Sequence, residues 1–112
     1  METDVLPGEV QRISLEGRLD IDGSQAIDVR FSAQATTRKA NIVVDLAAVT
    51  FLASIGIRLL ITAARGQKQR GGKLVLAAAQ PAVRKVLASA GIDLLIPVYD
   101  DVESARAAIV AA

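Results

Sequence analysis

The sequence predicts an α/β domain in which a small mixed sheet packs against about four helices. Segments with strand patterns alternate along the chain with segments of helical periodicity. Two of the strand segments are continuous apolar runs, which are typical of strands buried on both faces. The 112 residues are 52% hydrophobic and 22% charged, which excludes a disordered chain. We therefore expect one domain spanning residues 1–112.

The first part of the chain predicts two strands separated by a helix. Residues 10–21 alternate apolar and polar side chains, and Gly17 interrupts them, which indicates a β-bulge or two short strands. A helix is expected from Gly23 to about Thr37. The run 41–46 that follows has the composition of a buried strand. The helix side chains that recur every fourth residue are Ile27, Phe31 and Ala35.

A second helix is expected from Ser54 to about Gln69, because the apolar residues there change to helical spacing. The glycine pair 71–72 ends it, and residues 73–77 form the second continuous apolar run. Four basic side chains cluster around the C-terminal end of this helix, where positive charge interacts favourably with the helix dipole. They therefore indicate a solvated helix cap rather than a nucleic-acid-binding patch. They are Arg65, Lys68, Arg70 and Lys73.

The last part of the chain predicts a helix, a short strand and a final helix. Pro81 suits the first turn of the third helix and Gly91 ends it. Residues 94–98 are expected to form the strand, and Asp100 or Asp101 to cap the final helix. The inward faces of the two helices comprise Val83, Val86, Leu87 and Ala90, and then Val102, Ala105 and Ile109.

Composition excludes several classes of function. The chain has no Cys and no His, which removes thiol chemistry, zinc sites and a Ser-His-Asp triad. A net charge of +1 and 3% aromatic residues give no reason to expect nucleic acid or an anionic membrane as partner. The apolar region 52–64 is too short to span a bilayer. We expect a cytoplasmic protein that is not an enzyme and has no metal or cofactor.

Asp45 and Gly56 have alternative interpretations. Asp45 ends a buried strand, where a carboxylate more often bonds backbone N–H groups than performs catalysis. Gly56 lies in the first turn of a helix, where glycine costs about 1 kcal/mol relative to alanine. It therefore indicates close approach of a partner or packing against the adjacent strand.

Ser54 stands where a buried apolar run gives way to a helix. A serine there can cap the helix by accepting a bond from a backbone N–H group. A phosphate at the same place would meet those N–H groups and the positive end of the helix dipole. The residue is therefore a structural cap, a covalent switch, or both.

The second helix presents two stripes. The core stripe comprises Ile57, Leu60, Ile61 and Ala64, and the opposite, polar stripe comprises Arg58, Thr62, Arg65 and Gln69. Ile55 and Leu59 lie beside the polar stripe, away from the core centre. They form either a partner-binding surface or a surface that a neighbouring helix or loop covers.

Beyond these patterns, the order and spacing of several segments resemble the STAS domain family, and specifically the free-standing anti-sigma factor antagonists. The resemblance covers nearly the whole chain and implies a mostly parallel sheet with helices largely on one face. The segments are Gly17-Arg-Leu-Asp20, Ile42-Val-Val-Asp-Leu46, Val49-Thr-Phe-Leu-Ala-Ser-Ile-Gly-Ile57, Gly71-Gly-Lys-Leu-Val-Leu76, Val83-Arg-Lys-Val-Leu87 and Ala90-Gly-Ile92.

The resemblance implies a regulatory binding module. In this family the serine matching Ser54 is phosphorylated by an anti-sigma factor that is also a serine kinase. The unmodified antagonist binds that kinase and frees the sigma factor, and a PP2C-type phosphatase resets the phosphorylated form. We expect a monomer or weak dimer that regulates transcription by partner switching. The expected partner-binding residues are Asp20, Ala53, Ile55, Gly56, Arg58, Leu59 and Thr62.

Two residues depart from the family pattern. Ala53 stands where the family usually has aspartate, and Ile55 stands where a small polar residue, often serine, is usual. The alternative function is therefore a STAS subunit that binds constitutively, without phosphoswitching, in a transport complex or a stress-signalling scaffold. Asp20 matches an acidic position that lies near the serine in the family, or is an exposed turn residue.

Overall fold

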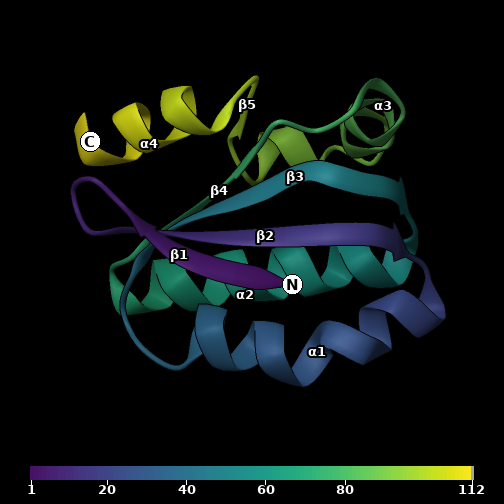
Figure 1. Cartoon of the computed structure of the whole chain (residues 1–112), viewed down its shortest axis with the longest axis horizontal. Helices are drawn as coiled ribbons and strands as arrows, with labels where there is room; N and C mark the ends of the chain where they lie inside the picture. Colours follow the sequence, from purple (N-terminus) through teal and green to yellow (C-terminus); the bar gives the residue numbers. More distant parts are fainter. Residues whose placement is uncertain (112) are drawn as a thin grey trace.

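Five strands form one sheet in the order β1-β2-β3-β4-β5, and β1 alone runs antiparallel to its neighbour (Figure 1). The computed structural model describes residues 1–111. The strands are β1 (Glu2–Leu6), β2 (Val10–Leu19), β3 (Asn41–Leu52), β4 (Lys73–Ala77) and β5 (Val98–Tyr99). The helices are α1 (Ile21–Thr36), α2 (Ser54–Arg70), α3 (Pro81–Ser89) and α4 (Val102–Ala111), with a 3₁₀ turn, η1, at Ile92–Leu94. The predicted fold class is confirmed.

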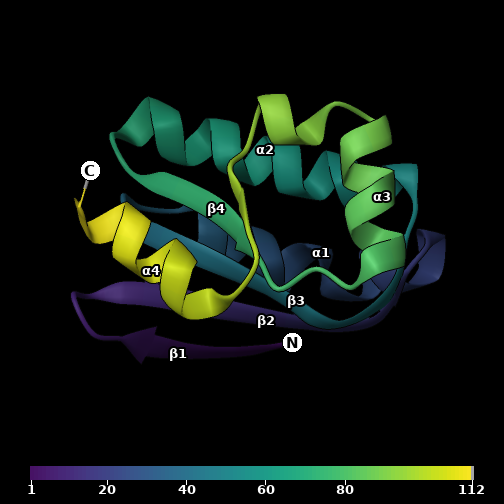
Figure 2. The same cartoon turned by 90° about the horizontal axis from the view of Figure 1, so that it is seen from above.

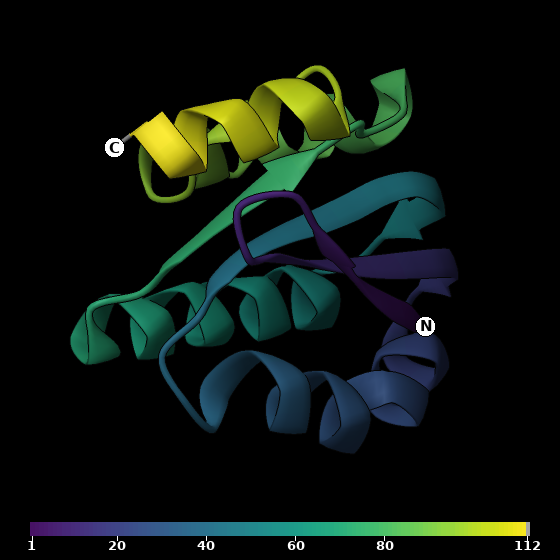
Figure 3. The ribbon, with the colours of Figure 1, turned by 60° about the vertical axis from the view of Figure 1, so that its left-hand side comes forward.

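Helices cover both faces of the sheet, but the two faces carry unequal cores. α1 and α2 lie side by side on one face and α4 lies on the other (Figures 1 and 3). α3 packs against β3 and contributes Val83 and Leu87 to the same apolar cluster as α1 and α2. The smaller cluster lies between α4 and the sheet, where Ala105 and Ile109 face inward as expected. Most of the core therefore supports α1, α2 and α3.

The end of β2 differs from the sequence expectation by two residues. β2 stops at Leu19, and α1 begins at Ile21 rather than at Gly23, because the Asp20 side chain caps the helix. Asp20 Oδ1 accepts a hydrogen bond of 2.9 Å from the Gly23 N–H. The predicted bulge is confirmed: the register with β3 shifts on both sides of Gly17, whose φ is +75°.

The sequence patterns missed β1 and the second half of β3. β1 is an edge strand whose side chains are mostly exposed, so it has no alternating pattern, and Arg12 on β2 holds it through Asp4 at 2.9 and 2.7 Å. β3 continues six residues beyond the expected end at residue 46. The Asp45 carboxylate accepts a bond of 3.0 Å from the Ala47 N–H, so the expected backbone role is confirmed but lies within the strand.

The expected strand over residues 94–98 is wrong. Gly91 adopts a left-handed conformation, and the chain then makes a helical turn in which the Ile96 N–H donates to the Ile92 carbonyl at 2.8 Å. That spacing buries both isoleucines and leaves Leu94 and Leu95 exposed. Strand pairing starts only at Val98. Asp101 caps α4 by accepting from the Ser104 N–H at 2.7 Å, as one of the two expected caps.

Gln67 is fully buried and was not identified from the sequence. Its amide nitrogen donates to the carbonyls of Ala35 and Arg38 at 2.6 and 2.8 Å. Its carbonyl oxygen accepts from the Ala40 N–H at 2.9 Å. One side chain thus ties the C-terminal part of α2 to the last turn of α1 and to the loop between α1 and β3.

We expect Gln67→Leu to lower the free energy of unfolding by about 3 kcal/mol, because it leaves one buried and two part-buried backbone groups without their partner. Urea denaturation followed by circular dichroism measures the change. Gln69→Leu, at an exposed position of the same helix, is the control and should change stability by about 0.5 kcal/mol or less. Equal stability of the two variants would contradict this role of Gln67.

The two glycines of α2 should respond oppositely to alanine. A β-carbon on Gly56 would lie 2.8 Å from Leu52 Cδ1 and 3.1 Å from the Leu19 carbonyl oxygen, whereas one on Gly66 would meet chiefly the mobile end of Arg70 at 3.2 Å. Gly66→Ala should stabilise by about 1 kcal/mol through helix propensity. Gly56→Ala should destabilise by roughly 1–2 kcal/mol, because overpacking exceeds that gain. Thermal unfolding of both variants checks the opposite signs.

Candidate functional site

Two strand-to-helix junctions meet at one edge of the sheet. β2 and β3 are parallel, so the β2–α1 and β3–α2 junctions both follow the carboxyl ends of their strands. The Ala53 N–H donates a backbone hydrogen bond of 3.0 Å to the Leu19 carbonyl and joins the two junctions. Gly56 is buried and lies against Leu19, so the first turn of α2 comes close to the end of β2. Gly56 positions α2 by packing, one of its two expected uses.

Asp20 lies in the first of these junctions, where its carboxylate already has two partners. It accepts from the Gly23 N–H and, at 3.5 Å, from Arg18 Nε. The Gly23 hydrogen bond, with a smaller contribution from Arg18, holds the pKa of Asp20 below its ordinary value. The Arg18 guanidinium also lies 4.3 Å from the centre of the Phe51 ring. Asp20, Arg18 and Phe51 thus form one connected group beside the start of α2.

Ser54 does not cap α2, so the capping hypothesis is wrong. Ala53 occupies the N-cap position with an extended backbone and offers no side-chain acceptor, while Ser54 is already the first helical residue. The Ser54 side chain is exposed. The N–H groups of residues 54–56 precede the first helical bond, which Ile57 donates to Ala53, and have no acceptor in residues 1–111. The first turn of α2 therefore exposes the Ser54 hydroxyl and contains N–H donors that have no acceptor within residues 1–111.

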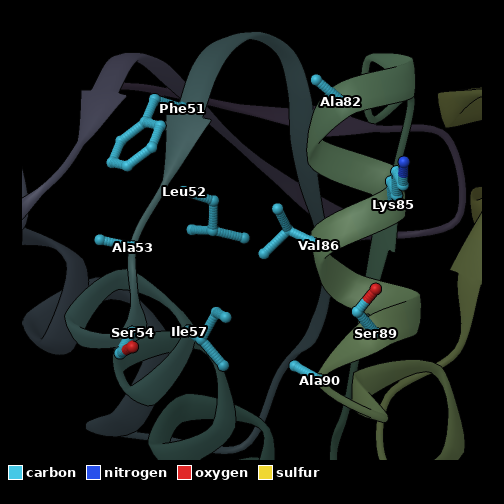
Figure 4. Close-up of a pocket in the computed structure, with 10 residues that line it drawn as sticks. All are labelled: Phe51, Leu52, Ala53, Ser54, Ile57, Ala82, Lys85, Val86, Ser89 and Ala90. Atoms are coloured by element: carbon cyan, nitrogen blue, oxygen red, sulfur yellow. The ribbon is translucent and has the colours of Figure 1, made fainter.

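A groove of about 760 Å³ separates the start of α2 from α3 (Figure 4). Ser54 lies on its α2 side, and Val86 points from α3 toward Leu52 and Ile57 (Figure 4). Lys85 and Ser89 line the groove on the α3 side. The floor and walls are mainly apolar, and Lys85 adds a cation at the rim. The lining residues are Phe51, Leu52, Ala53, Ser54, Ile57, Ala82, Lys85, Val86, Ser89 and Ala90.

The contribution of α3 was missed because its whole apolar stripe was assigned to the core. Val83 and Leu87 are buried, but Val86 is 36% exposed and Ala90 is exposed, so both expectations of burial are wrong. Three of these apolar positions lie in α3 and the fourth, Ala90, is its C-cap, and together they cover a wider arc than two core contacts need. That excess was the sequence signal for a second apolar surface.

A smaller groove of about 320 Å³ runs along the other side of α2, against α1. It contains the remaining expected partner-binding residues: Ile55, Arg58, Leu59 and Thr62. Leu59 is half-buried and packs against the main core, so a neighbouring helix covers part of this surface. Ile55 is half-buried without joining either core cluster, and Arg58 and Thr62 are exposed. The expected residues thus flank the first two turns of α2 on the α1 side.

The region combines an apolar groove with an exposed serine hydroxyl and backbone N–H groups that have no acceptor within residues 1–111. No group of three or more metal-ligating side chains occurs within residues 1–111. In the same residues, no helix is long and apolar enough to cross a bilayer. The first turn of α2 carries no acidic residue. An anionic group could therefore be accommodated there without repulsion from its own helix.

Three comparisons place these features among known proteins. The family model described as "Mlab, STAS domain" matches residues 3–97. The protein named "Putative anti-sigma factor antagonist BtrV" from Bordetella bronchiseptica is 29% identical over 94 residues, which cover 84% of this chain and 81% of that protein.

Two solved structures are similar throughout the chain. An anti-sigma factor antagonist from Mycobacterium paratuberculosis is 26% identical with a TM-score of 0.85, and the match covers 96% of this chain and 91% of that one. The STAS domain of a SulP transporter from Vibrio cholerae is 25% identical with a TM-score of 0.72, over 96% of this chain and 83% of that one. The match of the family model to residues 3–97 shows that the chain belongs to the STAS domain family.

Proposed function

We propose that this protein is an anti-sigma factor antagonist, a non-enzymatic module that binds an anti-sigma factor through the surface around the start of α2. The observation that carries the proposal is the exposed Ser54 hydroxyl at an uncapped helix start, beside a large apolar groove. The name and high coverage of the Bordetella relative support the same role.

Phosphorylation of Ser54 is the proposed switch. A partner kinase transfers the terminal phosphoryl group of ATP to the serine oxygen, and the hydroxyl proton leaves. The product carries about −1.5 to −2 charge at neutral pH. The unpaired N–H groups at the start of α2 would donate hydrogen bonds to the phosphate oxygens, so the domain should stay folded. A phosphatase of the PP2C type would hydrolyse the ester and restore the hydroxyl.

The same charge would weaken the complex. Ser54 shares the groove with Leu52, Ile57 and Val86, so a partner that fills the groove with apolar side chains must desolvate the phosphate. A cost of roughly 2 kcal/mol corresponds to about a 30-fold loss of affinity. That is enough to change partners when concentrations lie near the dissociation constant.

A second candidate function is a constitutive STAS subunit of a transport complex or a signalling scaffold. Ala53 and Ile55 favour it, because a permanent interface needs neither a carboxylate nor a polar residue beside the serine. The transporter-derived STAS domain from Vibrio cholerae has the same fold at comparable identity. In this function the groove between α2 and α3 is occupied permanently and Ser54 stays unmodified.

The switch is tested by measuring, with isothermal titration calorimetry, how tightly Ser54 variants bind the cognate anti-sigma kinase. Ser54→Glu should weaken binding by about 30-fold, and Ser54→Ala should bind within about 3-fold of the unchanged protein. Ser104→Glu, an exposed serine on α4, controls for charge alone and should have no effect. Equal affinities of the glutamate and alanine variants at Ser54 would rule out the switch.

Intact-mass and peptide analysis of the protein purified from its own organism separates the two functions. The antagonist function predicts a fraction of chains that carry one phosphate, located on Ser54. The constitutive function predicts unmodified Ser54 together with co-purified membrane ATPase subunits.

The groove itself should be required for either function. Val86→Asp places a charge on its apolar wall and should weaken binding of the partner about 10-fold or more. Because Val86 is 36% exposed, the substitution should lower the free energy of unfolding by only roughly 1 kcal/mol. Val29→Asp, at an 81% exposed position of α1, is the matched control. Unchanged binding of Val86→Asp, measured by the same calorimetry, would exclude this groove from the interface.

A further inference from the structure

The first half of β4 has no pairing strand on the side away from β3, although Leu74 and Val75 are each only 5% exposed. β3 pairs with all five residues of β4, from Lys73 to Ala77. On the other side, β5 pairs only with Leu76 and Ala77. The segment that leads from η1 to β5 therefore meets β4 only near its C-terminal end (Figure 2).

Pro97 explains why the ladder stops. Leu76 pairs with Val98, and the Leu76 N–H donates to the Pro97 carbonyl at 3.0 Å. Two residues earlier in the same register, the Leu74 carbonyl would need the backbone N–H of Pro97, which proline lacks. Among residues 1–111, no backbone or side-chain hydrogen bond satisfies the Leu74 N–H on this side either. Leu74 thus presents one donor and one acceptor at the sheet edge.

A groove runs beside this edge. It has a volume of about 320 Å³, and Leu95 and Pro97 face β4 across it. Leu95 is 61% exposed and the neighbouring Leu94 is 88% exposed, so apolar surface continues beyond the groove. The groove residues are Ala64, Lys68, Gly72, Lys73, Leu74, Val75, Leu95 and Pro97. An apolar groove beside unpaired backbone groups has the features of a strand-addition site.

The charges around the groove have one sign. Lys68 and Lys73 line it, and Arg65 lines the adjoining hollow that shares Ala64, Lys68 and Leu95. Within residues 1–111 none of these three cations takes part in an ion pair. A negatively charged occupant would therefore find unpaired cations on both sides of the β4 edge.

We propose that the β4 edge binds an extended, acidic and apolar segment of a partner protein, which adds to the sheet as a further short strand. The backbone of that segment accepts from the Leu74 N–H and donates to the Leu74 carbonyl. Alternate apolar side chains enter the groove against Leu95, and acidic side chains reach Lys68 and Lys73. This site is separate from Ser54, because about 14 residues of α2, roughly 21 Å, lie between Ser54 and Lys68.

An NMR titration of the full ¹⁵N-labelled chain tests the proposal with defined peptides. The probe is acetyl-Glu-Val-Ile-Val-Glu-amide. It should cause saturable shifts centred on the Leu74 amide and slow the hydrogen exchange of that amide at least about 5-fold. The same peptide with its backbone nitrogens methylated should bind at least about 10-fold more weakly, because it cannot donate to the strand edge. Absence of a saturable shift at Leu74 up to millimolar peptide, or equal binding of the methylated peptide, overturns the proposal.

Charge variants give an independent readout. Lys68→Glu combined with Lys73→Glu should weaken binding of the acidic peptide at least about 5-fold and improve binding of a peptide in which lysine replaces both glutamates. Arg30→Glu, an exposed charge reversal on α1, should change neither affinity. Ser54→Glu should also leave peptide binding unchanged, so failure of the phosphoswitch and failure of strand addition are distinguishable. Equal loss in the Lys68/Lys73 and Arg30 variants would exclude a local charge effect.

Discussion

The hydrogen bond from the Ala53 N–H to the Leu19 carbonyl, together with the contact of Gly56 on Leu19, is the constraint on which the candidate site depends. It joins the ends of two parallel strands and seats the first turn of α2 against both. Asp20, Phe51 and Ser54 come from different elements, yet this junction brings them to one edge of the sheet. A helix start held by a side-chain cap would have left fewer N–H groups available there.

The opposite end of α2 is fixed by Gln67, so the helix is anchored at both ends. Its two ends then offer different chemistry to partners. The start has unpaired N–H donors and no acidic residue, which suits an anion attached to Ser54. Near the end, Lys68 lies beside the open edge of β4, which suits an acidic segment. Both surfaces suit negative charge, which we propose comes from a covalent modification at the start of α2 and from an added strand of a partner at β4.

The sequence predicted those elements whose side chains have a periodic burial. β4 matches its expected range of 73–77, and α2 begins at the expected residue, because both bury regular apolar patterns. β1 was missed since an exposed edge strand has no such pattern. Residues 94–97 were mistaken for part of a strand because a short apolar run is compatible with either spacing. The candidate site was identified on α2 but not on α3, where Val86 looked like a core residue.

The sequence by itself determined that a helix starts at Ser54, because the apolar residues change to helical spacing there. It also determined that chemistry based on histidine, cysteine or a metal cluster of such ligands has no residues to use. Only the tertiary structure decided that Ala53, rather than Ser54, occupies the cap position, and that α3 forms the second wall of the groove. The tertiary structure also places Pro97 opposite β4. Because proline has no backbone N–H, the Leu74 carbonyl has no donor there. Local patterns specify which residues form a helix or a strand, whereas hydrogen-bond partners and exposed surfaces depend on residues distant in the chain.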